Sequence, residues 1–411
     1  MNFSPSNIIA LCVLTLCFFA GGALQFVGLL SLTQSNYVAL LLIAAYLVLK
    51  PIRIRLDRSE IVLIVLTIYL ISGIFLNGSR PENVAVYIYY VFCPFLAVRF
   101  AKQALASNAS ISRVFFPTLF TFLLVQLLVT IFQSSFAEEL SNASAVSVIP
   151  IDIVSGTFYL ASDGSLSAFC ILACISTLWT DLSTTKKIII FSLALSVIGI
   201  ANSKAFQTLA PILAAWALIE AKLLRGRNSL FKGFILVLGA TLIAVVSYEA
   251  VFNKLGEFGA YLYDIYDFRY GDNRAQRLAP LGEIFYSPIS WAGKGALTYY
   301  NPITKEWLYN AGFSLIYMFY FDYGTIGLFL VLTYFLTLTL ECAGLSLRSM
   351  TLFFIFFVFC AFSPAITDLA FIIAYTFTCT LVKRGRLSID SVRSPKSLYL
   401  TQVSTLLPAA K

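Results

Sequence analysis

The sequence predicts an all-α polytopic integral membrane protein with one long external loop that carries short helices. Of the 411 residues 59% are hydrophobic and only 12% are charged, and the mean hydropathy is +0.87. A soluble domain carries about a quarter charged residues. A bilayer core requires roughly 20 apolar residues per helix, and such runs follow one another from Ile8 to Val382. They leave little room for a separate soluble domain.

The apolar runs predict about twelve transmembrane helices in order along the chain. The first run has no charged residues ahead of it and is followed by further spans, so we interpret it as a retained helix and not a signal peptide. Residues 1–382 then form a single transmembrane domain, and the basic, polar tail 383–411 is expected to be loosely ordered. The predicted spans are 8–32, 36–49, 60–76, 84–99, 114–133, 164–181, 187–202, 205–221, 232–251, 312–341, 350–362 and 365–382.

The basic residues predict the orientation, because loops rich in Lys and Arg stay in the cytoplasm. With both termini in the cytoplasm, twenty of the 28 basic residues fall in cytoplasmic loops or in the tail. The other eight are external, and most of them lie in the long loop 252–311. They are Arg80, Lys204, Lys254, Arg269, Arg274, Arg277, Lys294 and Lys305.

Composition also excludes several classes of function. The net charge of +8 comes from short loops beside the membrane, where basic residues meet anionic lipid headgroups, so we do not predict nucleic-acid binding. The chain has no histidine, which excludes histidine acid–base chemistry and argues against a zinc site. Seven of the eight cysteines fall in predicted spans and Cys342 directly follows one; in such positions cysteines act as small apolar residues. We predict no metal and no cofactor.

Two short external segments carry possible site residues. Arg80 lies in the turn "NGSRPEN" (77–83), where it either reaches toward lipid phosphates or serves a function. Lys204 lies in "ANSKAF", at the membrane boundary, where an ionisable residue is costly and is a functional candidate. A third external segment, 141–165, has no basic residue and is interpreted as a re-entrant or surface-lying connector.

The long loop gathers arginines that suit a phosphate ligand. Arg274 and Arg277 are three residues apart on a predicted amphipathic helix that lies on the outer leaflet. Arginine binds phosphate in a bidentate manner, so these residues are candidates for a lipid-linked pyrophosphate. The alternative is a set of surface charges paired within the loop. The turn Gly293-Lys294-Gly295 either offers backbone N–H groups to an anion or only redirects the chain.

One acidic residue lies inside a predicted span. Asp322 is about ten residues into the span that follows the long loop, an expensive place for a carboxylate. It is either a functional acid, or it pairs with a basic neighbour or supports a break in the helix at Gly324.

Four segments resemble the O-antigen and capsule repeat-unit polymerases known as Wzy, within the group that includes the O-antigen ligases. They are "DIVSGTFYL" (152–160), "NSKAF" (202–206), the arginine-containing loop with "SPISWAGKG" (287–295), and "FDYGTIGLFLVL" (321–332). Ligases of this group carry a histidine near the last segment, and this chain has none, which favours a polymerase.

The resemblance implies a metal-independent glycosyltransferase in the bacterial inner membrane. It joins undecaprenyl-pyrophosphate-linked repeat units at the periplasmic face, and its partners are donor and acceptor glycans, membrane lipids and a chain-length-regulating copolymerase. On that basis Arg274, Arg277 and Asp322 are expected to be catalytic. The residues expected to bind substrate are Lys204, Arg80, Arg269, Lys294, Asp272 and Glu283. The alternatives are an O-antigen ligase and a flippase or transporter of lipid-linked oligosaccharides, although transporters often contain internal repeats and none is seen here.

Overall fold

The computed structural model describes residues 5–50, 57–106, 111–146, 150–159, 163–180, 182–201, 290–298, 300–301, 306–307, 315–362 and 368–393. Within these ranges the chain is helical apart from irregular connections and one two-residue hairpin. The elements are α1 (Pro5–Thr15), the π-helix η1 (Leu16–Ala20), α2 (Gly21–Phe26), α3 (Leu32–Leu49), α4 (Arg58–Leu76), α5 (Pro81–Ala106), α6 (Ile111–Ser135), α7 (Ala137–Ala143), the 3₁₀ turn η2 (Pro150–Ile153), α8 (Asp163–Leu178), α9 (Thr184–Ala201), β1 (Tyr300–Asn301), β2 (Glu306–Trp307), α14 (Leu315–Ala343), α15 (Leu347–Phe362) and α16 (Leu369–Arg393).

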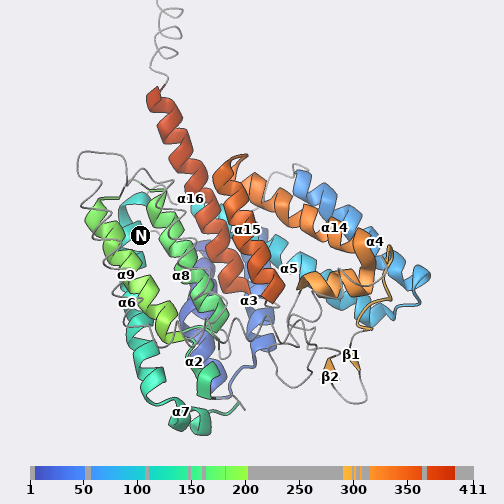
Figure 1. Ribbon diagram of the computed structural model, residues 1–411, viewed down its shortest axis with the longest axis horizontal. Coiled ribbons are helices and arrows are strands. Elements are labelled where there is room, and N and C mark those ends of the chain that lie inside the picture. Colours follow the sequence, from blue (N-terminus) through green and yellow to red (C-terminus); the bar gives the residue numbers. More distant parts are fainter. Residues whose placement is uncertain are drawn as a thin grey trace, which may run out of the picture.

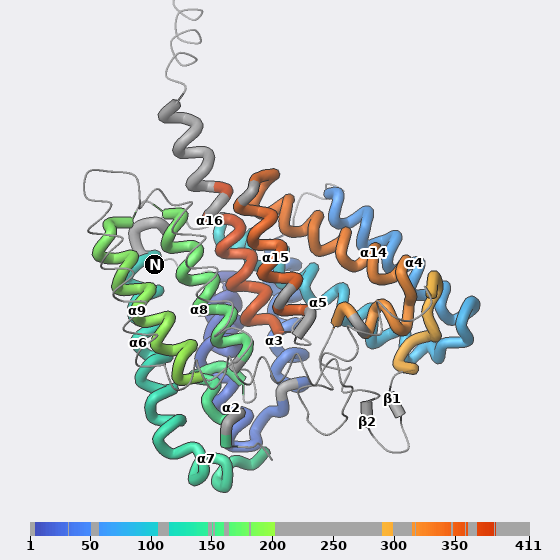
Figure 2. Tube along the Cα trace, viewed as in Figure 1, coloured from blue at the N-terminus to red at the C-terminus, as the bar shows by residue number. Residues whose placement is uncertain are grey.

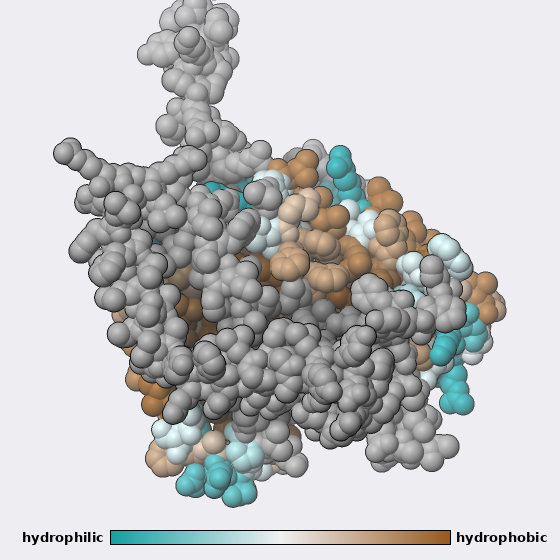
Figure 3. Space-filling model, viewed as in Figure 1, coloured by the Kyte–Doolittle hydropathy of each residue, from teal (hydrophilic) through white to brown (hydrophobic). Residues whose placement is uncertain are grey.

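Six helices in the described part of the chain are long and apolar enough to cross a membrane, and four shorter apolar helices accompany them. Their outward faces are apolar as well: Val48 is 78% exposed and Phe75 is 84% exposed. Figure 3 shows apolar side chains along α4 and α14, with hydrophilic residues toward the two ends of α4. This pattern confirms a helical protein suited to a membrane. The predicted spans 205–221 and 232–251 lie outside the described residues.

The first predicted span is shorter than expected. The helical run ends at Phe26, because Gly28 adopts a left-handed conformation with φ of 73°. The next helix begins at Leu32, where Ser31 and Gln34 form a reciprocal capping box. A prediction from apolar runs alone extends the first span to residue 32, because residues 27–30 remain apolar although their backbone has left the helix.

The last helix is longer than expected. We predicted a loosely ordered tail from residue 383, but α16 continues to Arg393. No proline interrupts residues 383–393, whereas Pro395 disfavours a helical conformation at Ser394. The first part of the predicted tail, through Arg393, is therefore helical.

The helices form two groups that meet at α16 (Figures 1 and 2). One group contains α4, α5, α14 and α15, with α14 packed along α4. The other contains α6, α8 and α9, in which α9 packs against both α6 and α8. Helix α16 contacts α5, α8 and α14, and α3 packs against α1 and α5. This arrangement brings helix ends that are distant in sequence onto the same side of the molecule.

A charged cluster holds one end of the first group together. The carboxylate of Glu341 on α14 accepts hydrogen bonds of 2.7 Å from both the backbone N–H and the hydroxyl of Ser59, at the start of α4. Lys102 of α5 lies 3.5 Å from the same carboxylate. Arg99 pairs with Asp57 at 3.2 Å and with Glu60. The basic residues of this cluster belong to the loops that we predict to be cytoplasmic.

Candidate functional site

At the opposite end of α4, α5 and α14, helix α14 is broken at Gly324. The backbone of Gly324 has φ of 67° and ψ of −168°, so the helical hydrogen bonds are interrupted there. The segment 290–298 replaces them. The N–H groups of Lys294 and Gly295 donate to the carbonyls of Phe321 and Asp322, at 3.0 and 2.9 Å. In return the N–H of Thr325 donates to Ser290 at 2.8 Å. Segment 290–298 thus supplies partners for backbone groups that the break would otherwise leave open, as a membrane-embedded backbone requires.

Two glycines allow this close approach. A Cβ atom on Gly293 would overlap with the backbone of Asp322, and one on Gly324 would overlap with the carbonyl of Trp291. Both glycines also have positive φ values, which L-residues with a side chain rarely adopt. The first glycine of the Gly-Lys-Gly turn is therefore explained by packing against the broken helix.

Asp322 lies at the centre of this junction and its side chain is completely buried. Its Oδ2 accepts hydrogen bonds from the Tyr87 hydroxyl of α5 and from the backbone N–H of Leu297, the latter at 2.6 Å. Its Oδ1 accepts a 2.9 Å hydrogen bond from the Thr298 hydroxyl. Among the described residues no basic side chain pairs with it. The hydrogen bonds from Leu297 and Thr298 favour one of the roles considered for Asp322, in which it supports the break in α14 by holding segment 290–298.

Leu297 adopts the left-handed conformation, with φ of 58°. It is the single non-glycine residue with positive φ in the described ranges, and for such a residue this conformation costs about 1–2 kcal/mol. The hydrogen bond from its N–H to Asp322 holds it there. Strained backbone of this kind concentrates at functional sites, so the strain directs attention to this junction.

The turn between α4 and α5 completes the junction. The Asn77 side chain donates to the carbonyl of Ala292 at 2.9 Å, and that of Asn83 donates to the carbonyl of Ala296 at 3.1 Å. The Ser79 hydroxyl accepts from the N–H of Ala296 at 2.9 Å. The sequence "NGSRPEN" is thus a docking partner of segment 290–298, which sequence reasoning missed; its two asparagines were the available signal.

Three exposed side chains surround the buried junction. Arg80 follows Ser79 and is exposed, and no ion pair or hydrogen bond of its side chain occurs within the described ranges. Lys294 is exposed and lies 4.2 Å from the centre of the Phe321 ring. Trp291 is 65% exposed. Because the N–H groups of residues 293–297 all donate to protein acceptors, the Gly-Lys-Gly turn leaves only the lysine side chain for an anion.

A second non-helical segment, 153–159, is buried among the helices. Its Gly156 has φ of 66° and exchanges two hydrogen bonds with the side chain of Gln133. The N–H of Thr157 donates to the side-chain oxygen of the buried Gln126, and the Gln126 side-chain NH₂ donates to the Thr157 hydroxyl. That hydroxyl in turn donates to the carbonyl of Phe18 in the π-helix. The connector predicted over 141–165 therefore enters the helix bundle in this part. The two glutamines of α6 were not singled out from sequence, although polar residues within an apolar span were a usable signal.

The structure places three of the nine predicted site residues. Arg80, Lys294 and Asp322 are brought to one junction. The remaining six lie outside the described residues: Arg274, Arg277, Lys204, Arg269, Asp272 and Glu283. In the described ranges no group of three or more His, Cys, Asp and Glu side chains could hold a metal ion.

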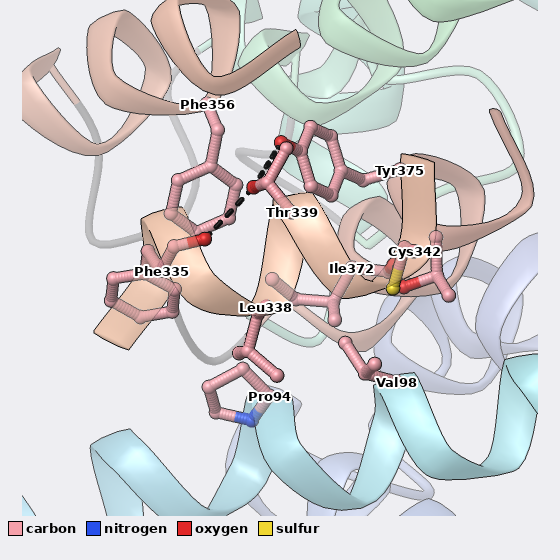
Figure 4. Close-up of a pocket in the computed structure, with 10 residues that line it drawn as sticks. Pro94, Val98, Phe335, Leu338, Thr339, Cys342, Phe356, Ile372 and Tyr375 are labelled. Atoms are coloured by element: carbon pink, nitrogen blue, oxygen red, sulfur yellow. Dashed lines mark hydrogen bonds between the residues drawn. The ribbon is translucent and has the colours of Figure 1, made fainter. Parts of the chain in front are cut away.

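The small pocket among α5, α14, α15 and α16 is a poor candidate site (Figure 4). Its lining is apolar apart from Thr339, Tyr375, Thr376 and Cys342. Thr339 and Tyr375 hydrogen-bond to each other at 2.7 Å. Pro94 lies inside α5 and, as a proline, has no backbone N–H to donate. The eight cysteines are all free, and all but Cys12 are buried. The pocket presents no charge to a substrate.

No model of a known protein family and no curated protein sequence matches this chain.

Proposed function

We propose that this protein polymerises undecaprenyl-pyrophosphate-linked oligosaccharide repeat units at the periplasmic face of a bacterial inner membrane. The observation that supports the proposal is the junction at Asp322. There "SPISWAGKG" and "FDYGTIG", two segments that carry the resemblance to Wzy polymerases, pair with each other through their backbones. Both segments belong to the side that the distribution of basic residues assigns to the periplasm.

The proposed reaction transfers a glycan between two lipid carriers. The hydroxyl at the non-reducing end of the acceptor repeat attacks the anomeric carbon of the donor glycan, and the bond from that carbon to pyrophosphate oxygen breaks. The hydroxyl proton passes to a carboxylate base, and undecaprenyl pyrophosphate leaves. Pyrophosphate is a good leaving group, so the protein chiefly positions the two lipids and neutralises phosphate charge.

We assign different roles in this reaction to the residues at the junction. Arg80 and Lys294 are exposed cations beside it and are suited to the pyrophosphate, together with Arg274 and Arg277 of the long loop. Asp322 is buried beneath segment 290–298 and acts as a positioning residue for that segment. The base is then a loop carboxylate, and Asp272 and Glu283 are the candidates.

The experiment that tests the function is the surface-glycan ladder of a deletion strain. A polymerase deletion leaves a single repeat unit on the surface. Loss of a flippase removes the surface repeat altogether, and loss of a ligase leaves polymer attached to its lipid carrier. Complementation with Arg274→Ala and Arg277→Ala, with expression checked, then tests the loop arginines. An unchanged ladder in the deletion strain would refute the proposal.

A further inference from the structure

Two basic side chains from different helices meet at the C-terminal end of α8. Trp179 follows the last residue of this helix and is 6% exposed. The guanidinium carbon of Arg348, the second residue of α15, lies 5.3 Å from the centre of the Trp179 ring. The ammonium group of Lys187, the fourth residue of α9, donates a 3.0 Å hydrogen bond to the carbonyl of Leu178. The two cations thus contact consecutive residues, and we call Trp179, Lys187 and Arg348 the Trp179 cluster.

The Trp179 cluster lies at the surface that we predict to be cytoplasmic. Helix α15 follows α14, whose last turn carries Glu341 of the charged cluster at the cytoplasmic end. Arg348 and Lys187 are only half-buried, and Leu345, three residues before Arg348, is 73% exposed. Both cations therefore keep part of their surface open to a ligand, and no opening of the helix bundle is needed to reach them.

Helix dipoles do not account for both cations. The C-terminal end of a helix carries about −0.5 charge and the N-terminal end about +0.5. The end of α8 favours one cation, but Arg348 lies in the first turn of α15, where a cation is unfavourable. The sequence between α8 and α9 contains one acid, Asp181, which lies outside the described residues. Even with Asp181 counted, the two cations and the three helix ends leave an excess of positive charge.

Trp179 contributes a hydrogen-bond donor as well as a ring. Its indole N–H has no hydrogen-bond partner within the described ranges, although a buried indole N–H usually has one. The face of the ring holds the Arg348 guanidinium by a cation–π contact. An anion bound by Arg348 would bring acceptor oxygens to the Trp179 side chain.

These groups favour one class of ligand. Arginine binds phosphate oxygens in a bidentate manner, and basic pockets between transmembrane helices on the cytoplasmic side bind the headgroups of anionic lipids. We propose that the Trp179 cluster binds the phosphate of an anionic phospholipid of the cytoplasmic leaflet. The site joins α15 of one helix group to α8 and α9 of the other, and it is separate from the Asp322 junction.

Lipid binding to the purified full-length chain measures this site. Phosphatidylglycerol is titrated into the protein in detergent, and bound lipid is followed by native mass spectrometry. Phosphatidylcholine with the same acyl chains and inorganic phosphate are the comparison ligands. We expect phosphatidylglycerol to bind more tightly than phosphatidylcholine, and inorganic phosphate to displace it only weakly. Arg348→Gln and Lys187→Gln should each weaken its affinity roughly tenfold or more, as expected for one lost charge-assisted hydrogen bond.

Lys186→Gln is the matched control. Lys186 precedes Lys187 and has the same charge, but its ammonium group lies 5.0 Å from the centre of the Phe116 ring on α6. The affinity of this variant for phosphatidylglycerol should equal that of the parent. Arg348→Lys should be intermediate, because it keeps the charge and loses the bidentate geometry. Trp179→Phe keeps the ring, removes the N–H, and should also bind more weakly than the parent.

Four results would overturn the lipid site. One is an unchanged affinity in Arg348→Gln and Lys187→Gln, and another is an equal loss in Lys186→Gln, which would indicate general surface charge. Equal binding of phosphatidylcholine would exclude recognition of an anionic headgroup. Ready displacement by inorganic phosphate would indicate a site for a soluble anion instead. If Arg348→Gln does not fold, Arg348→Lys and Lys187→Gln decide the outcome. Because the readout is lipid binding, none of these results depends on whether the chain polymerises glycans.

Discussion

The backbone N–H of Leu297 donates a 2.6 Å hydrogen bond to the carboxylate of Asp322, which fixes the external segment 290–298 over a break in α14. Leu297 is held in a strained left-handed conformation by this contact. The pairing explains why a span contains an acid that no basic residue in the described ranges neutralises. Its donors come from α5, from the strained backbone and from Thr298.

Asp322→Asn separates positioning from acid–base chemistry. An Asn oxygen in place of Oδ2 still accepts from Tyr87 and Leu297, and its NH₂ can donate to the Thr298 hydroxyl. We expect this variant to keep a glycan ladder and a Tm close to that of the parent. Asp322→Ala orphans the buried donors, costs about 1–3 kcal/mol per group, and should lose the ladder. A stable Asn variant without polymer would instead identify Asp322 as the base.

Gly293→Ala and Gly324→Ala should each separate segment 290–298 from α14. A methyl group at either position overlaps with backbone across the junction, and the positive φ adds about 1–2 kcal/mol of strain. We expect lower Tm and a lost ladder. Gly199→Ala in α9 is the control, since its new methyl group meets nothing within 4 Å and alanine favours the helix. Equal effects at all three positions would contradict the docking argument.

Gln126→Leu should release the buried segment 153–159. It removes the acceptor of the Thr157 N–H, which lies 2.9 Å from the Gln126 side chain, so about 1–3 kcal/mol of stability should be lost. Thermal unfolding in detergent measures this loss. Gln34→Leu removes an exposed capping glutamine and should cost less than Gln126→Leu. A wild-type Tm for Gln126→Leu would show that the glutamine does not hold the segment.

Arg80→Ala should reduce polymer formation without lowering Tm, because Arg80 is exposed and its side chain has no ion pair in the described ranges. Arg80→Lys should be intermediate, since lysine cannot bind phosphate in a bidentate manner. Glu82→Ala changes an exposed acid two residues away and serves as the control, with no loss of polymer expected. Comparable losses in Arg80→Ala and Glu82→Ala would argue against a specific cation site. The readout is the glycan ladder at matched expression.

The sequence by itself determined the helical membrane architecture of the described chain, because bilayer thickness sets the length of an apolar run and little else satisfies the backbone in lipid. It also singled out Arg80, Lys294 and Asp322, because placing a charged side chain in or beside the membrane costs free energy and such residues are therefore rare. Helix ends were less predictable. Residues 27–30 stay apolar after their backbone has left the helix, and α16 continues through polar residues to Arg393.

Only the tertiary structure decided which residues meet. The pairing of segment 290–298 with the break at Gly324, the support of Asp322 by Tyr87, and the insertion of 153–159 beside Gln126 all join positions far apart in the chain. A single sequence shows the periodicity of apolar residues and where a charged residue falls within an apolar run. A hydrogen bond between distant segments depends instead on where those segments lie after folding. For Gly293-Lys294-Gly295 that difference is concrete: the sequence allows either backbone N–H groups that bind an anion or a simple turn, and the backbone contacts favour the turn and leave only the Lys294 side chain for an anion.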